Sequence, residues 1–179
     1  MIPPGRRLTL AAMNTHIHFD IGSSTLGQVL VAINDKGICA VLPGDSAAAV
    51  KRELRERFPD VQLSQDPARL ARALPQVIEL VEGRRAALDL PLDPAGTEFQ
   101  QRVWRALRGI PAGRTASYAE IARRIDAPKS FRAVAQACGA NPIALAIPCH
   151  RVVRNDGALS GYRWGVARKR ALLEREARA

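Results

Sequence analysis

Cysteine is scarce in this sequence, and long hydrophobic runs are absent. The three cysteines, Cys39, Cys138 and Cys149, are odd in number and lie at unrelated spacings, which argues against a disulfide framework and against a zinc site. No stretch approaches the length of a membrane span, and residues 1–7 lack the apolar core of a signal peptide. We therefore expect a soluble, cytoplasmic protein that holds no metal and makes no membrane contact.

Acidic residues are scarce in the second half of the chain. Residues 1–95 hold 11 Lys+Arg and 11 Asp+Glu, whereas residues 96–179 hold 16 and 6, so the second half carries the entire net charge of +10. A basic half beside a neutral half indicates that only the second half faces a polyanion. A cationic surface that serves solubility alone is the alternative.

The first half shows the pattern of a small α/β domain. Residues 1–14 have no clear period and are expected to form a tail. Apolar and polar side chains alternate over residues 17–21, as in a half-buried strand. Two apolar runs, 25–33 and 38–42, flank the turn residues 34–37, which predicts a hairpin beside the first strand.

Two helices should follow this hairpin. Residues 46–58 and 66–81 carry apolar stripes at helical spacing, and each segment opens with an N-capping residue. Pro75 should kink or split the second helix. Residues 88–92 alternate again as an extended segment, which completes a domain over residues 1–92.

His16 and His18 lie on one face of the first predicted strand, a spacing from which two imidazoles can reach one metal ion. Zinc needs a third and usually a fourth ligand, and no cysteine or histidine cluster supplies them. We therefore expect no metal here and assign no chemistry to the first domain.

The second half predicts short helices over residues 97–107, 117–125 and 130–138. The third is alanine-rich and should present Arg132 and Gln136 outward together. Two short helices across a tight turn, in a basic half, indicate a helix-turn-helix whose second helix enters a DNA groove. An ordinary helical hairpin is the alternative, because the motif is short and degenerate.

The most informative stretch is Ile147–Val153, an apolar, strand-like run that contains a thiol beside an imidazole. Only the thiolate is reactive, so a nucleophilic cysteine needs cationic or proton-accepting neighbours, and His150 and Arg151 follow Cys149 directly. Pro148 stiffens the backbone before the thiol. Cys149 is therefore a candidate nucleophile, with a buried structural cysteine as the alternative.

The chain closes with a glycine-flanked aromatic loop, 160–165, and a helix over residues 166–178. On that helix Glu176 shares a face with Leu172 and Leu173. We expect its carboxylate to face inward and to need a partner, with a solvated helix end as the alternative.

Four segments together resemble the methylated-DNA–protein-cysteine methyltransferases: Asn141-Pro142, Ile147–Val152, Ser160–Tyr162 and Leu172–Glu176. The similarity is greatest to the bacterial adaptive-response members and covers the chain from about residue 17. It implies an α+β fold, with a ribonuclease-H-like α/β domain over residues 1–92 and a mainly helical, winged helix-turn-helix domain over residues 93–179.

The resemblance implies direct DNA repair, in which the cysteine irreversibly accepts the alkyl group from O6 of guanine and, less efficiently, from O4 of thymine in a duplex. The catalytic residues it implies are Cys149 as acceptor, His150 as the base acting through a water, Glu176 as the group that orients the histidine, and Asn141 as the residue that holds the turn. The DNA-binding residues are Tyr118, Ser130, Arg132 and Gln136, of which Tyr118 helps to extrude the nucleotide and Arg132 fills the vacated stack. The base pocket comprises Tyr118, Val152, Tyr162, Arg163 and Trp164.

Physical chemistry agrees with these implied roles. An O6-alkyl carbon is buried in a paired helix, so the base must be flipped out before a thiolate can attack it. Adjacent side chains on extended backbone point apart, so a water should bridge Cys149 and His150. The product is a stable thioether, so we expect one turnover without a cofactor. The resemblance further implies a monomer that binds double-stranded DNA through its minor groove.

Other functions stay open. The zinc-binding residues of some family members are absent, as is the separate methyl-sensing, transcription-activating domain that some members carry, so a regulatory role is not expected. A thiol hydrolase using Cys149, His150 and Glu176 is one alternative, but it lacks an identifiable oxyanion site. A DNA-binding regulator whose cysteine is incidental is the other.

Overall fold

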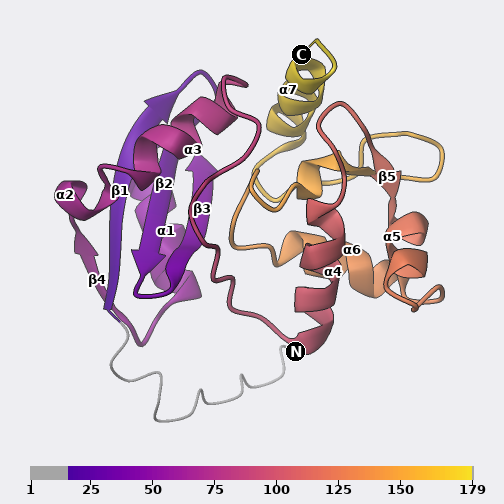
Figure 1. Ribbon diagram of the computed structural model, residues 1–179, viewed down its shortest axis with the longest axis horizontal. Helices are drawn as coiled ribbons and strands as arrows, with labels where there is room; N and C mark the ends of the chain where they lie inside the picture. The colour runs from indigo at the N-terminus through magenta and orange to yellow at the C-terminus, as the bar shows by residue number, and fades with distance from the viewer. Residues whose placement is uncertain (1–15, 179) are drawn as a thin grey trace.

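The computed structural model describes residues 16–178 and arranges them as two units, a sheet with helices on both faces and a mainly helical unit beside it (Figure 1). The strand order of the sheet is β3-β2-β1-β4. These strands are β1 (His16–Ser24), β2 (Gly27–Asn34), β3 (Gly37–Gly44) and β4 (Gln62–Gln65). β1 pairs antiparallel with β2 and parallel with β4, and β2 pairs antiparallel with β3.

Helices cover both faces of this sheet. α1 (Ala47–Arg57) packs on one face, and α2 (Pro67–Leu70) and α3 (Ala73–Val81) lie on the other (Figure 1). Leu54 of α1 and Val77 of α3 are buried against the strands, and burying such a side chain stabilises a fold by roughly 1.5–3 kcal/mol. The sheet unit thus has a core on each side.

The predicted hairpin and helices of this unit are confirmed, with two differences. The prediction missed β4, a short and largely polar edge strand that pairs only with β1. Residues 88–92 form no strand, and only Leu92 makes an isolated bridge, with Ile38. The second helix is split ahead of Pro75, into α2 and α3, as the proline predicted.

The second unit contains the three predicted short helices and the terminal helix. Its elements are α4 (Glu98–Arg108), β5 (Ala116–Ser117), α5 (Tyr118–Arg124), α6 (Phe131–Gly139), β6 (Val152–Val153) and α7 (Val166–Glu176). The buried Trp104 ties α4 to α6, because its indole Nε1 donates to the carbonyl of Ala137 at 2.9 Å. Within residues 16–178 no helix has the length and apolarity needed to cross a membrane.

The edge of the sheet formed by β3 joins the two units. The amide of Val41 in β3 donates to the carbonyl of Pro142 at 2.9 Å, and its carbonyl accepts from the amide of Ala144 at 3.1 Å. The linker between the units pairs with β3 further along the same edge. An edge strand presents a row of unpaired backbone groups that another segment can pair with. The first unit therefore anchors the segment that leads to Cys149.

Candidate active site

Two successive γ-turns carry the chain toward Cys149. The first is centred on Leu145, whose φ of 67° is left-handed, and an amide-to-carbonyl hydrogen bond of 2.8 Å closes it. The second is centred on Pro148, with φ −82° and ψ 63°, and is also closed at 2.8 Å. A left-handed leucine costs of the order of 1–3 kcal/mol and persists only where its surroundings impose it. Strain of this kind at a thiol is typical of a functional site.

The predicted strand-like run around the thiol is wrong. Cys149–Arg151 form a single 3-10 turn, η2, and only Val152–Val153 are a strand. The γ-turn at Pro148 bends the chain, and the amide of Arg151 then donates to the carbonyl of Pro148 at 3.0 Å. Cys149 and His150 are therefore neighbours on a tight helical turn. The argument that adjacent side chains of a strand point apart does not apply to them.

Asn141 holds this turn together. It is fully buried, and its Nδ2 donates to the carbonyl of Ile147 at 2.8 Å and to Sγ of Cys149 at 3.2 Å. Its Oδ1 accepts from the amide of Ile143 at 2.9 Å. One amide side chain thus bonds to the backbone of Ile143 and Ile147, on either side of the γ-turn at Leu145, and to the sulfur itself.

The thiol of Cys149 is buried, and its surroundings act on it in opposite directions. Burial raises the pKa of Cys149, while the hydrogen bond from Asn141 and the charges of Lys169 and Arg57 counteract that rise. Lys169 is itself only 1% exposed, and its Nζ donates to the carbonyl of Val152 at 2.6 Å. The thiol is therefore protonated at rest, and a base must remove its proton before it can react. The charges of Lys169 and Arg57 would then stabilise the thiolate.

Glu176 faces inward and binds two side chains. Its Oε1 lies 2.7 Å from Nε2 of His150, and Arg151 donates to both carboxylate oxygens, at 2.9 and 2.8 Å. Burial alone would raise the pKa of Glu176, but the bonds from His150 and Arg151 lower it to about 2. The carboxylate is therefore ionised at neutral pH, and the expected partner of this acid is present.

The Glu176 bond sets the protonation of His150. An ionised carboxylate only accepts hydrogen bonds, so Nε2 carries the ring proton and Nδ1 keeps its lone pair. Burial lowers the pKa of His150, against the opposing effect of Glu176, so the ring is neutral at rest. Nδ1 is buried and has no hydrogen-bond partner among residues 16–178. Nδ1 of His150 is therefore able to accept a proton.

Tyr118 and Tyr162 belong to the surroundings of the thiol. The hydroxyl of Tyr118, at the start of α5, lies 2.5 Å from that of Ser160. The hydroxyl of Tyr162 is buried without a partner among the described residues, and burial, followed by the charge of Cys149, raises its pKa well above the ordinary value. Val152, also expected in the pocket, is fully buried directly after η2.

Two other expected pocket residues bond to the first unit. Nε of Arg163 donates to Oε1 of Glu53 on α1 at 2.7 Å, and Nε1 of Trp164 donates to Oε2 of the same carboxylate at 3.2 Å. Trp164 is buried, and its ring meets that of Tyr162 edge-on at 5.3 Å between centroids. Trp164 therefore packs against the ring of Tyr162 and is bonded to α1.

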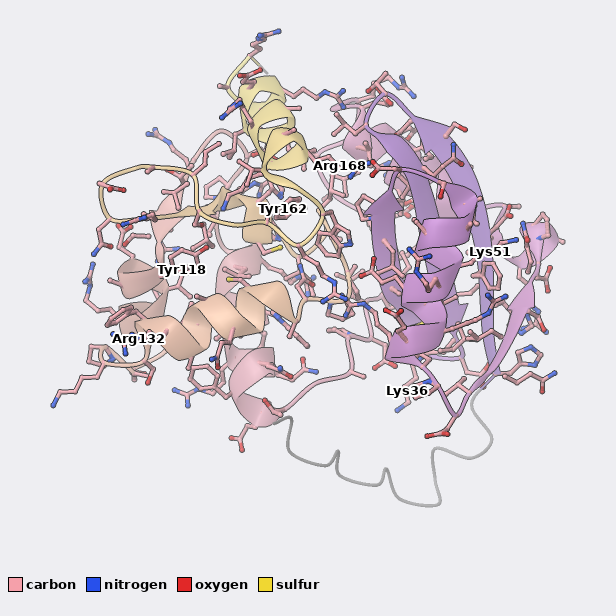
Figure 2. The ribbon with its side chains drawn as sticks, turned by 180° about the vertical axis from the view of Figure 1, so that it is seen from behind. Lys36, Lys51, Tyr118, Arg132, Tyr162 and Arg168 are labelled. Carbon is pink, nitrogen blue, oxygen red and sulfur yellow. The ribbon has the colours of Figure 1, made fainter. Side chains whose placement is uncertain are left out.

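The other expected DNA-contacting residues lie on α6 and at its N-cap. Arg132 and Gln136 are exposed, as predicted, and Ser130 caps the helix without a side-chain hydrogen bond. Figure 2 shows Arg132 at the end of α6 that points away from the sheet. Phe131, which the sequence did not single out, is 46% exposed, and the Arg132 guanidinium lies 5.8 Å from its ring centre.

Sequence reasoning missed the contribution of the first unit. Glu53 and Arg57 of α1 both contact the segments around Cys149. Their spacing of four residues indicates a helical ion pair and nothing more. Lys169 also had a signal, since it lies seven residues before Glu176 and so on the same helical face.

Each histidine of β1 has a polar neighbour, and the buried Nδ1 of His18 makes no hydrogen bond among the described residues. Nε2 of His16 lies 2.8 Å from the hydroxyl of Ser64, and Nδ1 of His18 lies 3.2 Å from Asp66. Over residues 16–178, no three His, Cys, Asp or Glu side chains are grouped closely enough to hold a metal ion.

Two family models match the chain. Residues 8–94 match the ribonuclease-like domain of 6-O-methylguanine DNA methyltransferase, and residues 98–178 match the DNA-binding domain of the same family. The expected α+β fold, a ribonuclease-like α/β unit followed by a helical DNA-binding unit, is confirmed.

Curated relatives point the same way. The chain is 50% identical over 164 residues to the regulatory protein Ada of Salmonella typhimurium, a match that covers 92% of this chain but only 46% of that protein. It is 44% identical over 162 residues to the inducible methylated-DNA–protein-cysteine methyltransferase of Bacillus subtilis, covering 90% of this chain and 86% of that protein. The chain thus spans about half the length of the Ada protein and most of the Bacillus protein.

Solved structures share the fold. The crystal structure of Mycobacterium tuberculosis OGT in complex with DNA superposes with a TM-score of 0.78 at 38% identity, over 90% of this chain and 93% of that one. The O6-methylguanine-DNA methyltransferase of Pyrococcus kodakaraensis has a TM-score of 0.70 at 19% identity, over 89% of this chain and 98% of that one. From sequence and fold together, the chain belongs to the methylated-DNA–protein-cysteine methyltransferase family.

Proposed function

We propose that this chain repairs DNA by transferring the alkyl group from O6 of guanine, and less efficiently from O4 of thymine, to Cys149 in a single turnover. One arrangement carries the proposal: a buried thiol held by Asn141, beside a histidine with a free Nδ1 and with Nε2 bound to an ionised glutamate. Membership of the family supports the same activity. The basic second unit, residues 93–179, would hold the duplex.

The chemistry of the proposed step balances without a cofactor. Nδ1 of His150 takes the thiol proton, directly or through one water, and Glu176 stabilises the resulting imidazolium. The thiolate then attacks the alkyl carbon, so that the S–C bond forms while the C–O6 bond breaks and leaves its electron pair on guanine. The imidazolium of His150 then gives its proton to the guanine that has lost the alkyl group. The products are normal guanine and a thioether, which ends the activity of that molecule.

A duplex that contains one O6-methylguanine tests this proposal. With the protein in excess, the proposed transfer restores guanine in the DNA and adds one methyl group to the protein. With the DNA in excess, it stops after one methyl per chain. Repeated turnover would indicate a hydrolase instead, and unchanged DNA and protein would indicate a DNA-binding regulator.

The position of α6 motivates a prediction for Arg132. We infer that Arg132 enters the base stack from the minor groove and fills the space of the flipped nucleotide. Arg132→Ala should then slow repair of a methylated duplex by about tenfold or more, since unstacking costs a few kcal/mol, while reaction with free O6-methylguanine stays unchanged. Arg132→Lys is the matched control for charge, because lysine keeps the positive charge but lacks the planar group. Equal losses on duplex and free base would exclude this role.

The contact between the rings of Trp164 and Tyr162 motivates a prediction about alkyl size. We infer that the indole narrows the space beyond the O6 carbon, so that methyl fits and benzyl is held back from Sγ of Cys149. A misplacement of about 1 Å can cost on the order of a hundredfold in rate. Trp164→Gly should therefore increase the rate with O6-benzylguanine far more than the rate with O6-methylguanine. A variant that gains nothing on the benzyl substrate would restrict Trp164 to packing.

A further inference from the structure

One carboxylate of the first unit gathers the active-site loop of the second. The side chain of Glu53 is only 17% exposed, and it accepts hydrogen bonds from three residues. Arg57, one helical turn along α1, donates to it at 3.2 Å through Nε and through a terminal nitrogen. Arg163 and Trp164 reach it from the loop before α7, a separation of more than 100 residues along the chain.

Arg57 extends this contact to the turn that holds the thiol. Its two terminal nitrogens donate to the carbonyl of Ala140 at 3.4 Å and to the carbonyl of Asn141 at 3.3 Å. The side chain of Arg57 is only 14% exposed. Holding so long a side chain in one conformation costs conformational entropy, which its hydrogen bonds must offset. The side chain of Asn141 in turn binds Sγ of Cys149. Two hydrogen bonds, one to the backbone of Asn141 and one from its side chain, therefore link Arg57 to the sulfur of Cys149.

We propose that Glu53 and Arg57 are positioning residues of the transfer site, with Arg57 fixing the Asn141 turn and Glu53 fixing the loop that carries Tyr162 and Trp164. This inference rests on the proposed alkyl transfer and deepens it. The first unit is then part of the machinery of transfer. Its α1 sets both the position of the sulfur and the room left for the alkyl group.

The charges fit this assignment. Glu53 is the acidic centre between two guanidinium groups, those of Arg57 and Arg163. Burial, followed by the charge of Arg163, lowers the pKa of Arg57 from its ordinary high value, and Glu53 opposes this change. Without Glu53, two partly buried cations would face each other. We expect them to separate and to release the loop and the indole.

Alkyl size gives a readout for Glu53 that a loss of stability does not reproduce. Glu53→Ala should raise the ratio of the O6-benzylguanine rate to the O6-methylguanine rate by about tenfold, because a freed indole leaves room for the larger group. Glu56→Ala is the matched control, since Glu56 lies exposed on the same helix. In the Trp164→Gly background, Glu53→Ala should leave the ratio unchanged. An unchanged ratio in the single variant, or a further rise in the double variant, would overturn the proposal for Glu53.

The pH dependence of the rate gives the readout for Arg57. Arg57→Ala removes both the bonds to the Asn141 turn and a cation near Cys149, so the thiolate should form at higher pH and the rate profile should shift upward in pH. Arg57→Lys keeps the charge and should restore part of the shift, and Arg55→Ala, exposed on the same helix, should have none. A lower rate with an unshifted profile would assign Arg57 to stability alone. Wild-type protein that transfers no alkyl group would instead refute the proposed function.

Discussion

A Cys149→Ala variant is expected to transfer no alkyl group, while its affinity for DNA stays within about twofold of wild type, because phosphate contacts dominate such binding. Cys149 is only 5% exposed and offers almost no contact surface. Restoration of guanine in a methylated duplex measures the transfer, and fluorescence anisotropy with the same duplex measures the affinity. A variant that still restores guanine would contradict the assignment of Cys149.

The other two cysteines supply matched controls for this experiment. Cys39 lies in β3 and Cys138 in α6, and both are buried. Burial, with a smaller effect of Asp93, raises the pKa of Cys39 to about 12, and burial also raises the pKa of Cys138 far above neutral. Cys39→Ala and Cys138→Ala should therefore retain the full rate. Alkyl groups found on either cysteine would locate the acceptor elsewhere.

Glu176→Gln is expected to lower the transfer rate at neutral pH by about a hundredfold, the scale of a lost general-base contribution. Glutamine still accepts the proton of Nε2 but carries no charge, so the imidazolium of His150 loses its stabilisation. Wild-type Glu176, with a pKa of about 2, is ionised throughout the neutral range. The thiolate of the variant must form without that help. Its rate should therefore rise toward higher pH, and the deficit should shrink there.

Rates measured between about pH 6 and pH 9, which brackets the ordinary pKa values of histidine and cysteine, test this expectation. Glu174→Gln is the control, because Glu174 is exposed on the same helix and its loss should leave the profile unchanged. If the profiles of Glu176→Gln and wild type coincide, Glu176 does not act through His150.

Apolar periodicity and capping patterns predicted the elements that have one buried and one exposed face. Ile17 and Phe19 are both buried in β1, as their alternation required. The predicted helix over residues 117–125 begins at Ser117, which forms both bonds of a capping box with Glu120. β4 gave no such signal, because an edge strand with polar side chains buries little and is formed by pairing with β1.

The active site could be predicted only in part from local pattern. Helical spacing placed Glu176 inward, but its partner was implied by family resemblance. The 3-10 turn at Cys149 was not predictable from the apolar run, because the side chain of Asn141 and the γ-turn at Pro148 impose it. Glu53 lies more than 100 residues from Trp164, and no local rule links such residues.

The most direct test is to react wild-type protein with a duplex containing one O6-methylguanine, digest the protein and locate the added methyl by mass spectrometry. The proposed mechanism predicts one methyl per chain, on the peptide that contains Cys149, and no further transfer when fresh methylated DNA is added. A methyl on any other residue, or continued restoration of guanine by the same protein molecules, would contradict it.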